Sequence, residues 1–314
     1  MGRYSSPTTI KRRLKTVNKR EYEKSSDYQE SLAILQGFTK DVLEGDIEKL
    51  REFNFSNLTQ YVGESIDPDM YLITQAIYIL LWGDIYDLTF KKIGPWSWRN
   101  KYPFRGDTIN SFRSLFGSED IRRDETFAFR AKLYGADKNP RLWEKINKFS
   151  RSYHCIGNFI VIPNRGSLKY GINGARAGYY DSMRDYFDWF LIAVAEFQRK
   201  VKEGESHFTK FEKQLRRNPE YYPDFLSIKE WEERFFLTPY FKDGKPTLLF
   251  KKPLEERLKV TDPNGTDPQI SYYAEEYLEL LEDFIDRSEE VIKYRTDKII
   301  EVLKYKLPRN IVAE

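Results

Sequence analysis

Two long stretches of the chain repeat apolar side chains at the three- and four-residue spacing of an amphipathic helix. The first runs from about residue 174 to 202 and the second from about residue 271 to 305. Such stripes are expected to face a core, because helices in proteins gain most of their stability from packing an apolar face. The second stretch carries its stripe at Tyr277, Leu280, Leu281, Phe284, Ile285, Val291, Ile292, Ile299 and Leu303. The chain therefore has to fold around long helices.

Shorter segments add further helices and a little sheet. Helical patterns and capping residues predict helices over residues 26–53, 67–81, 107–116, 125–134, 140–149, 208–217 and 227–236. A β-favouring run over residues 153–163 predicts the main strand, residues 85–90 alternate as a short strand does, and Asp243-Gly244 predicts a hairpin turn. The predicted fold is mainly α with a small β-sheet (α+β), with long amphipathic helices packed around a short sheet.

Charge is distributed unevenly, although the formal net charge of the 314 residues is only +3. Residues 1–24 hold eight basic and two acidic side chains, a net +6, and residues 91–151 hold fifteen and seven, a net +8. Aromatic rings are interleaved with the cations of the second region. In proteins that bind nucleic acid, cations bind phosphates and aromatic rings stack on bases. The same rings also suit a packed core. A nucleic-acid groove and a core both remain open as interpretations.

Composition and charge suggest one folded unit with polar ends. Hydrophobic residues at 40% and charged residues at 32% exclude intrinsic disorder. Residues 1–24 are interpreted as a basic, flexible leader, residues 25–306 as a single α+β domain with the option of a sub-boundary near 150, and residues 307–314 as a tail. The longest apolar run is shorter than a bilayer crossing and no secretory signal is apparent, so we expect a cytoplasmic protein with no membrane partner.

Cysteine and histidine are scarce. One cysteine, Cys155, excludes a multi-thiolate zinc site, and two histidines leave few ways to build a nitrogen-ligated centre, so no metal or cofactor is predicted. His154 is the candidate general acid or base because imidazole titrates near neutral pH, although a ring hydrogen-bonded between strand and helix is the structural alternative. Cys155 is interpreted as core, because alternation along a strand turns neighbouring side chains to opposite faces.

The other candidate residues flank the predicted strand and the start of the first long helix. Those expected to bind a ligand or phosphate here are Asn158, Asn164, Arg165, Asn173, Gly174 and Arg176. A helix N-terminus offers free backbone N–H groups, so Gly174 and Arg176 suit an anion. Alternatively, Gly174 only permits a turn and Arg176 pairs with a core carboxylate.

Three short motifs resemble a bacterial family classed as a domain of unknown function. They are Asp-Thr-Ile-Asn-Ser-Phe at residues 107–112, His-Cys-Ile-Gly-Asn-Phe at 154–159 and Ile-Asn-Gly-Ala-Arg at 172–176. The resemblance spans about residues 70–300 and includes an arginine of the C-terminal helix near Arg295. It implies a cytosolic bacterial or phage-associated protein. It also marks Asp107 as a catalytic candidate beside His154 and adds Asn110 to the ligand-binding candidates.

The sequence therefore supports two functional hypotheses. In the first, the protein is a defence or toxin-type effector that engages nucleic acid or a nucleotide. There Arg176 holds phosphate, Asn158 and Asn173 orient the ligand, and His154 transfers a proton. In the alternative, the protein is a non-catalytic helical module that binds a protein partner or forms a homo-oligomer. Whether the protein is an enzyme stays open at this level.

Overall fold

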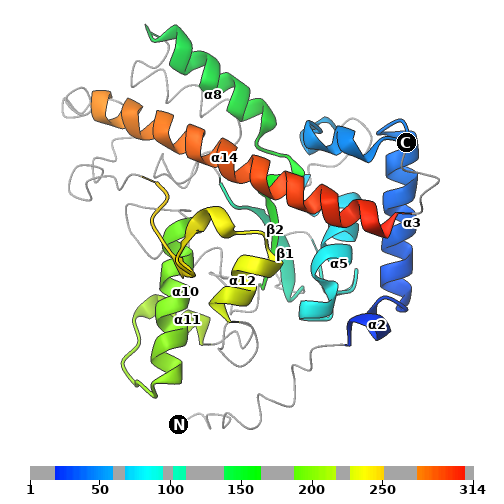
Figure 1. Cartoon of the computed structure of the whole chain (residues 1–314), viewed down its shortest axis with the longest axis horizontal. Helices are drawn as coiled ribbons and strands as arrows, with labels where there is room; N and C mark the ends of the chain where they lie inside the picture. Colours follow the sequence, from blue (N-terminus) through cyan, green and yellow to red (C-terminus); the bar gives the residue numbers. More distant parts are fainter. Residues whose placement is uncertain are drawn as a thin grey trace.

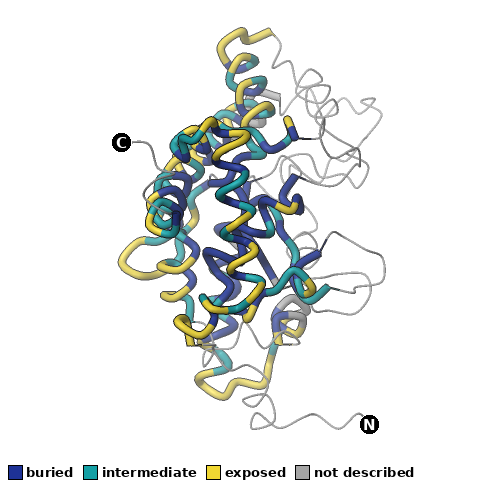
Figure 2. Tube along the Cα trace, turned by 90° about the vertical axis from the view of Figure 1, so that its right-hand side faces the viewer, coloured by how far each residue is buried: buried dark blue, intermediate teal, exposed yellow. Residues whose placement is uncertain are grey.

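The computed structural model describes residues 18–58, 68–94, 102–110, 138–163, 187–216, 227–250 and 274–307. Helices dominate these ranges, and two small antiparallel sheets of two strands each complete them (Figure 1). In side view the buried residues form a continuous inner layer, with exposed residues on the outer turns (Figure 2). The predicted class, mainly α with a small sheet, is confirmed.

The longest helix, α14 (Ala274–Lys306), runs along the long axis of the molecule and confirms the pattern predicted over residues 271–305 (Figure 1). Its buried stripe includes Leu281, Phe284, Ile285, Val291, Ile299 and Leu303. This stripe packs against α8 (Pro140–Ser152) and the 3₁₀ turns η1 (Ile47–Arg51) and η5 (Ile156–Asn158). The helix thus contacts segments that lie far apart in the sequence.

The N-terminal part is a set of helices and turns. It comprises α2 (Lys19–Tyr22), α3 (Ser26–Asp41), η1, η2 (Phe55–Leu58), η3 (Pro68–Met70) and α5 (Leu72–Tyr86). The helical pattern predicted over residues 26–53 is divided: α3 ends at Asp41, and Glu44 and Gly45 take positive φ values of 54° and 83° before η1 begins. α5 is buried on most sides, as its nearly continuous apolar sequence predicts.

The main sheet pairs β1 (Phe104–Thr108) with β2 (Phe159–Pro163) in antiparallel register. Two sequence predictions fail here. The helix predicted from Asp107 is wrong at its start, because Asp107 and Thr108 belong to β1 and lie opposite Ile160 and Phe159 of β2; residues 111–116 lie outside the described ranges. The predicted strand over residues 153–163 forms only from Phe159, after the 3₁₀ turn η5.

The strand predicted over residues 85–90 is wrong. Ile85 and Tyr86 form the last turn of α5, and Asp87 ends that helix in the left-handed conformation, with φ 51°. The apparent alternation is the buried end of a helix followed by the buried Leu88. A short apolar pattern of this length is ambiguous between helix and strand, and the preceding helix decides it.

The C-terminal part contains α10 (Phe187–Lys202), α11 (Lys210–Leu215), α12 (Ile228–Arg234), η7 (Thr238–Tyr240), β3 (Phe241–Lys242) and β4 (Lys245–Pro246). The predicted capping box of Ser227 and Glu230 is present, and the hairpin turns at Asp243 and Gly244, both with positive φ. The predicted helix over residues 125–134 and residues 174–186 of the predicted first long helix lie outside the described ranges; the described part of that prediction is α10. Within those ranges no helix is both long and apolar enough to cross a membrane.

Candidate functional site

Asn158 and Asn110 meet in the interior, where β1 ends and η5 leads into β2. Nδ2 of Asn158 donates to the carbonyl oxygens of Asn110 and Tyr153, both at 2.8 Å, and its Oδ1 accepts from the N–H of Asn110 at 2.9 Å. The exposed fractions are 0% for Asn158 and 1% for Asn110. The backbone therefore occupies both amide donors of Asn158.

Tyr240 extends this polar cluster to a third segment. Its hydroxyl donates to Oδ1 of Asn110 at 2.8 Å, so η7 is connected to the end of β1. Nδ2 of Asn110 is buried and has no hydrogen-bond partner among the described residues. This geometry gives the two asparagines a structural role as connectors, and their role toward a ligand stays a prediction.

His154 lies in the connection between α8 and η5 and contacts η2. Its Nδ1 is 2.6 Å from Oγ of Ser56, and its carbonyl oxygen accepts from the N–H of Phe55 at 2.9 Å. The ring also lies against Tyr153, with 3.9 Å between ring centroids. Ser56 was not predicted from the sequence, because nothing in its local pattern connects it to a residue about a hundred positions later.

Asp107 sits in β1 opposite Ile160 and is half-buried. Its Oδ1 accepts from the N–H of Thr108 at 3.0 Å. The structure therefore brings Asn110 and Asn158 together, while His154 contacts a different element. The remaining predicted site residues lie outside the described ranges: Asn164, Arg165, Asn173, Gly174 and Arg176.

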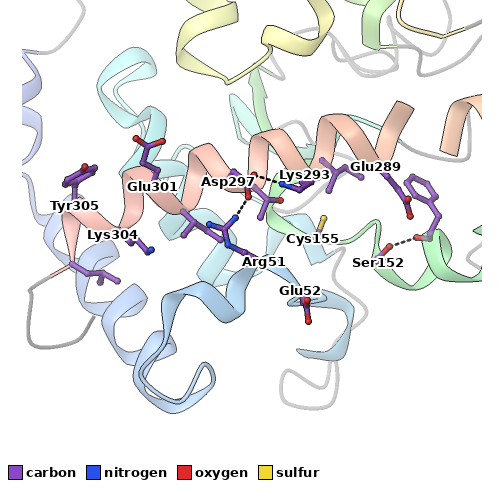
Figure 3. Close-up of a pocket in the computed structure, with 15 residues that line it drawn as sticks. Arg51, Glu52, Ser152, Cys155, Glu289, Lys293, Asp297, Glu301, Lys304 and Tyr305 are labelled. Atoms are coloured by element: carbon purple, nitrogen blue, oxygen red, sulfur yellow. Dashed lines mark hydrogen bonds and ion pairs between the residues drawn. The ribbon is translucent and has the colours of Figure 1, made fainter. Parts of the chain in front are cut away.

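A groove of ≈ 1350 Å³ follows the C-terminal half of α14 (Figure 3). In Figure 3, Lys304 and Tyr305 lie at one end of it, Glu289 lies at the other, and Cys155 lies between them, nearer to Glu289. The groove is lined by Arg51, Glu52, Phe149, Ser152, Cys155, Glu289, Ile292, Lys293, Thr296, Asp297, Ile300, Glu301, Lys304, Tyr305 and Leu307. None of the four predicted site residues that the structure describes is in this lining.

The most buried lining residues are apolar or nearly so, and they form the floor: Phe149, Cys155, Thr296, Ile300 and Leu307. Cys155 is 6% exposed, which confirms its interpretation as a core residue. Burial raises the pKa of its thiol to about 11, against the smaller opposing effect of nearby N–H groups and Arg295. At neutral pH this group is a protonated thiol and a poor nucleophile.

The rims of the groove carry charges of both signs. Three lining residues are cationic (Arg51, Lys293 and Lys304) and four are anionic (Glu52, Glu289, Asp297 and Glu301). Asp297 pairs with Lys293 at 2.9 Å and with Arg51 from η1. The hydrogen bond from Lys293 is the largest of the effects that lower the pKa of Asp297 below its usual range.

Two residues hold α14 against the segment that carries Cys155. A Cβ atom placed on Gly157 would lie 2.3 Å from the carbonyl oxygen of Ile292 and 2.1 Å from Oγ1 of Thr296, so only glycine permits this approach. Arg295 is fully buried and donates to the carbonyl oxygens of Gly157, of Phe159 at 2.9 Å and of Phe235 at 3.1 Å. Position 295 entered the sequence analysis only through the family resemblance.

Two lysines of the basic region, both on α8, face the acidic side of α14. Lys145 on α8 pairs with Glu282 at 2.7 Å and with Asp286 at 2.8 Å, and Lys148 pairs with Glu289 at 3.3 Å. In the sequence the acidic residues of the C-terminal helix and the basic region of residues 91–151 belong to separate segments. The tertiary structure instead lets these charges offset one another along the α8–α14 contact.

Comparison of the chain with models of protein families, with curated proteins and with solved structures gives no match. The resemblance described for residues 70–300 therefore stays a prediction. Within the described ranges, no group of three or more histidine, cysteine or acidic side chains is arranged to hold a metal ion.

Proposed function

We propose that this protein is a helical interaction module whose groove along α14 receives an extended segment of a protein partner. The observation that carries the proposal is the size and shape of the groove. Its volume of ≈ 1350 Å³ exceeds the roughly 300–1,000 Å³ typical of small-molecule pockets. From Glu289 to Leu307 the helix rises roughly 27 Å, the length of about eight extended residues.

The chemistry of the lining also suits a peptide. An apolar floor with charged rims resembles the apolar core and polar rim of protein interfaces. Tyr305 is 85% exposed at one end, and exposed tyrosines are frequent anchors of such contacts. Side chains of a bound segment would bury on the floor, while the rim pairs with charges of either sign.

The same lining disfavours nucleic acid in this groove. Binding to phosphates requires an excess of cations, whereas the rims carry three cations against four anions. Lys145 and Lys148, which belong to the basic region of residues 91–151, are already paired with carboxylates of α14. The effector hypothesis depends on the basic region and on the cluster from His154 to Arg176, of which residues 164–176 lie outside the described ranges, and it is kept as the rival in the experiment below.

A library of short random peptides tests the proposal. Peptides are selected for binding to the full-length protein. Their affinities are then measured for the rim variants Glu289→Lys and Lys304→Glu and for Tyr305→Ala. The matched control is Lys229→Glu on α12, because Lys229 has a 75% exposed side chain and does not line the groove. We expect the groove variants to weaken binding about tenfold or more, as for interface anchors, and the control to leave it unchanged.

Single-stranded RNA and DNA oligonucleotides and free nucleotides are measured in parallel over a range of salt concentrations. Tight binding of an oligonucleotide with a steep salt dependence, unaffected by the groove variants, would favour the effector hypothesis. Selected peptides that bind the groove variants as well as the unmodified protein would contradict the proposal.

A further inference from the structure

We propose that Ser56 and His154 form a nucleophile–base pair that accepts the acyl group of an uncharged carboxylic ester. This activity goes beyond the groove along α14, because neither residue is part of its lining. Both residues are half-buried, so their side chains keep some contact with solvent. The sequence marks His154 as a candidate acid or base, whereas Ser56 becomes a candidate only through the tertiary structure.

The first step is the contact between the two side chains. Oγ of Ser56 lies 2.6 Å from Nδ1 of His154. A serine hydroxyl is a weak nucleophile until an adjacent base removes its proton, and a separation of about 2.6–3.2 Å is typical of such pairs. In the tautomer that carries its proton on Nε2, Nδ1 accepts the hydroxyl hydrogen. The pair therefore has the geometry of an activated nucleophile.

The second step is the way in which the backbone holds the pair. The N–H of Phe55 donates to the carbonyl oxygen of His154 at 2.9 Å, and Nδ2 of Asn54 donates to the carbonyl oxygen of Arg151. Oδ1 of Asn54 accepts from the N–H of Ser56 at 2.9 Å. These bonds join two segments that are remote along the chain. They fix the nucleophile relative to the base, and catalysis depends strongly on such positioning.

The third step is the class of substrate. The imidazole ring lies against the ring of Tyr153, with 3.9 Å between centroids, and the ring of Phe159 is 6.4 Å away. Asn54, which holds the backbone of Ser56, is neutral. Aromatic and neutral surroundings suit an uncharged acyl group, whereas phosphoryl transfer depends on cations that offset the charge of the transferred group. An uncharged carboxylic ester is therefore the expected substrate.

In the acylation step, Oγ of Ser56 bonds to the carbonyl carbon of the ester while its proton passes to Nδ1 of His154. The bond from that carbon to the leaving oxygen then breaks, and His154 gives the proton to this oxygen, which departs as an alcohol. Water reverses the roles: its oxygen bonds to the carbonyl carbon, its proton passes to His154, and Ser56 leaves with that proton. The products are an alcohol and a carboxylic acid, and the pair is restored.

A fluorophosphonate probe tests the pair in the full-length protein, because its phosphorus bonds to an activated serine oxygen with loss of fluoride. Mass spectrometry of the digested protein identifies the labelled residues. We expect Ser56 to carry most of the label, Ser56→Ala to lose it, and His154→Ala to react about a hundredfold more slowly, as for loss of a general base.

Ser206 is the matched control for labelling. It is exposed and precedes His207, the other histidine of the chain, and none of the hydrogen bonds that the structure describes joins these two side chains. We expect little label on Ser206 and an unchanged rate in Ser206→Ala.

Hydrolysis of p-nitrophenyl acetate, an uncharged ester, separates a catalytic histidine from a structural one. Ser56→Ala and His154→Ala should both lose activity, and added imidazole should restore part of the rate in His154→Ala alone, because a free base replaces the missing ring. Circular dichroism establishes that the variants are folded. If His154→Ala is unfolded, His154→Gln takes its place, since glutamine keeps a polar contact with Ser56.

Two results overturn the inference. One is labelling of Ser56 no faster than that of Ser206. The other is a folded His154 variant that reacts with the probe as fast as the unmodified protein.

Discussion

Arg295 of α14 and Phe159, the first residue of β2, are joined by a buried hydrogen bond of 2.9 Å from Nη2 to the carbonyl oxygen. The same guanidinium reaches the carbonyl oxygens of Gly157 and Phe235, so one side chain connects the long helix to η5, the sheet and the end of α12. Loss of hydration lowers the pKa of Arg295 to about 10. No carboxylate among the described residues pairs with it, and the three carbonyl dipoles offset part of its desolvation.

Replacement of Arg295 should be among the most destabilising changes on α14. Arg295→Leu leaves three buried carbonyl oxygens without their donors, and we expect a loss of about 3–5 kcal/mol in the free energy of unfolding. Arg295→Lys should also lower the free energy of unfolding, because an ammonium group cannot reproduce the fixed, planar arrangement of the guanidinium donors. Urea denaturation measures both variants. A loss of less than about 1 kcal/mol for Arg295→Leu would show that these bonds contribute little.

Two glycines in helices should respond oppositely to alanine. A Cβ on Gly83 of α5 would lie 1.9 Å from the hydroxyl oxygen of Tyr22, whose ring is buried and whose hydroxyl donates to the carbonyl of Leu88 at 2.7 Å. Gly83→Ala should therefore cost about 1–3 kcal/mol through overpacking. A Cβ on Gly37 of α3 meets nothing within 4 Å, so Gly37→Ala should stabilise by about 0.5–1 kcal/mol.

Thermal or urea unfolding of the two alanine variants checks this pair. Each serves as the control for the other, since both introduce one methyl group into a helix. Stabilisation by Gly83→Ala would mean that α5 and Tyr22 do not approach as closely as described.

The buried thiol of Cys155 should make stability fall at alkaline pH. Its pKa is raised from 9.0 to about 11 in the folded protein. Between these values the unfolded chain releases the thiol proton while the folded chain retains it, so the free energy of unfolding decreases as pH rises. Below pH 9 this loss of stability is negligible. It reaches about 2–3 kcal/mol once pH exceeds the folded pKa.

Cys155→Ala isolates this effect. The variant lacks the thiol but keeps the tyrosines, including Tyr28, whose pKa burial raises to about 12. The difference in unfolding free energy between the two proteins should therefore shrink as pH is raised from 9 toward 11. A difference that is independent of pH would contradict burial of the thiol.

Replacement of Asn158 should lower the free energy of unfolding more than replacement of His154. Asn158→Leu removes both amide donors and the acceptor for Asn110, and we expect it to cost about 2–4 kcal/mol. His154→Ala removes the part-buried contact with Ser56 and the ring contact with Tyr153, and it should cost about 0.5–1.5 kcal/mol. Denaturation measures both. If His154→Ala leaves toxicity or nucleotide turnover unchanged in a folded protein, its proposed role in proton transfer is excluded.

The local elements follow from the sequence because their causes are local. The stripe on α14, the capping box of Ser227 and Glu230, and the turn at Asp243 each depend on side chains within a few positions of one another. Helical period, caps and turn residues are read within that range. Cys155 is buried as predicted, but strand alternation is not the reason, because it precedes η5 and β2 begins only at Phe159.

The sheet and the groove depend on distant residues. Asp107 begins a helical pattern, yet it lies in a strand because β2 is buried and its backbone needs a hydrogen-bonding partner. The groove combines Arg51, the segment around Cys155 and the second half of α14, which no local pattern connects. Sequence by itself determined the long helices and their apolar faces. The tertiary structure alone decided which faces meet, because burial and backbone pairing are satisfied between segments that are remote along the chain.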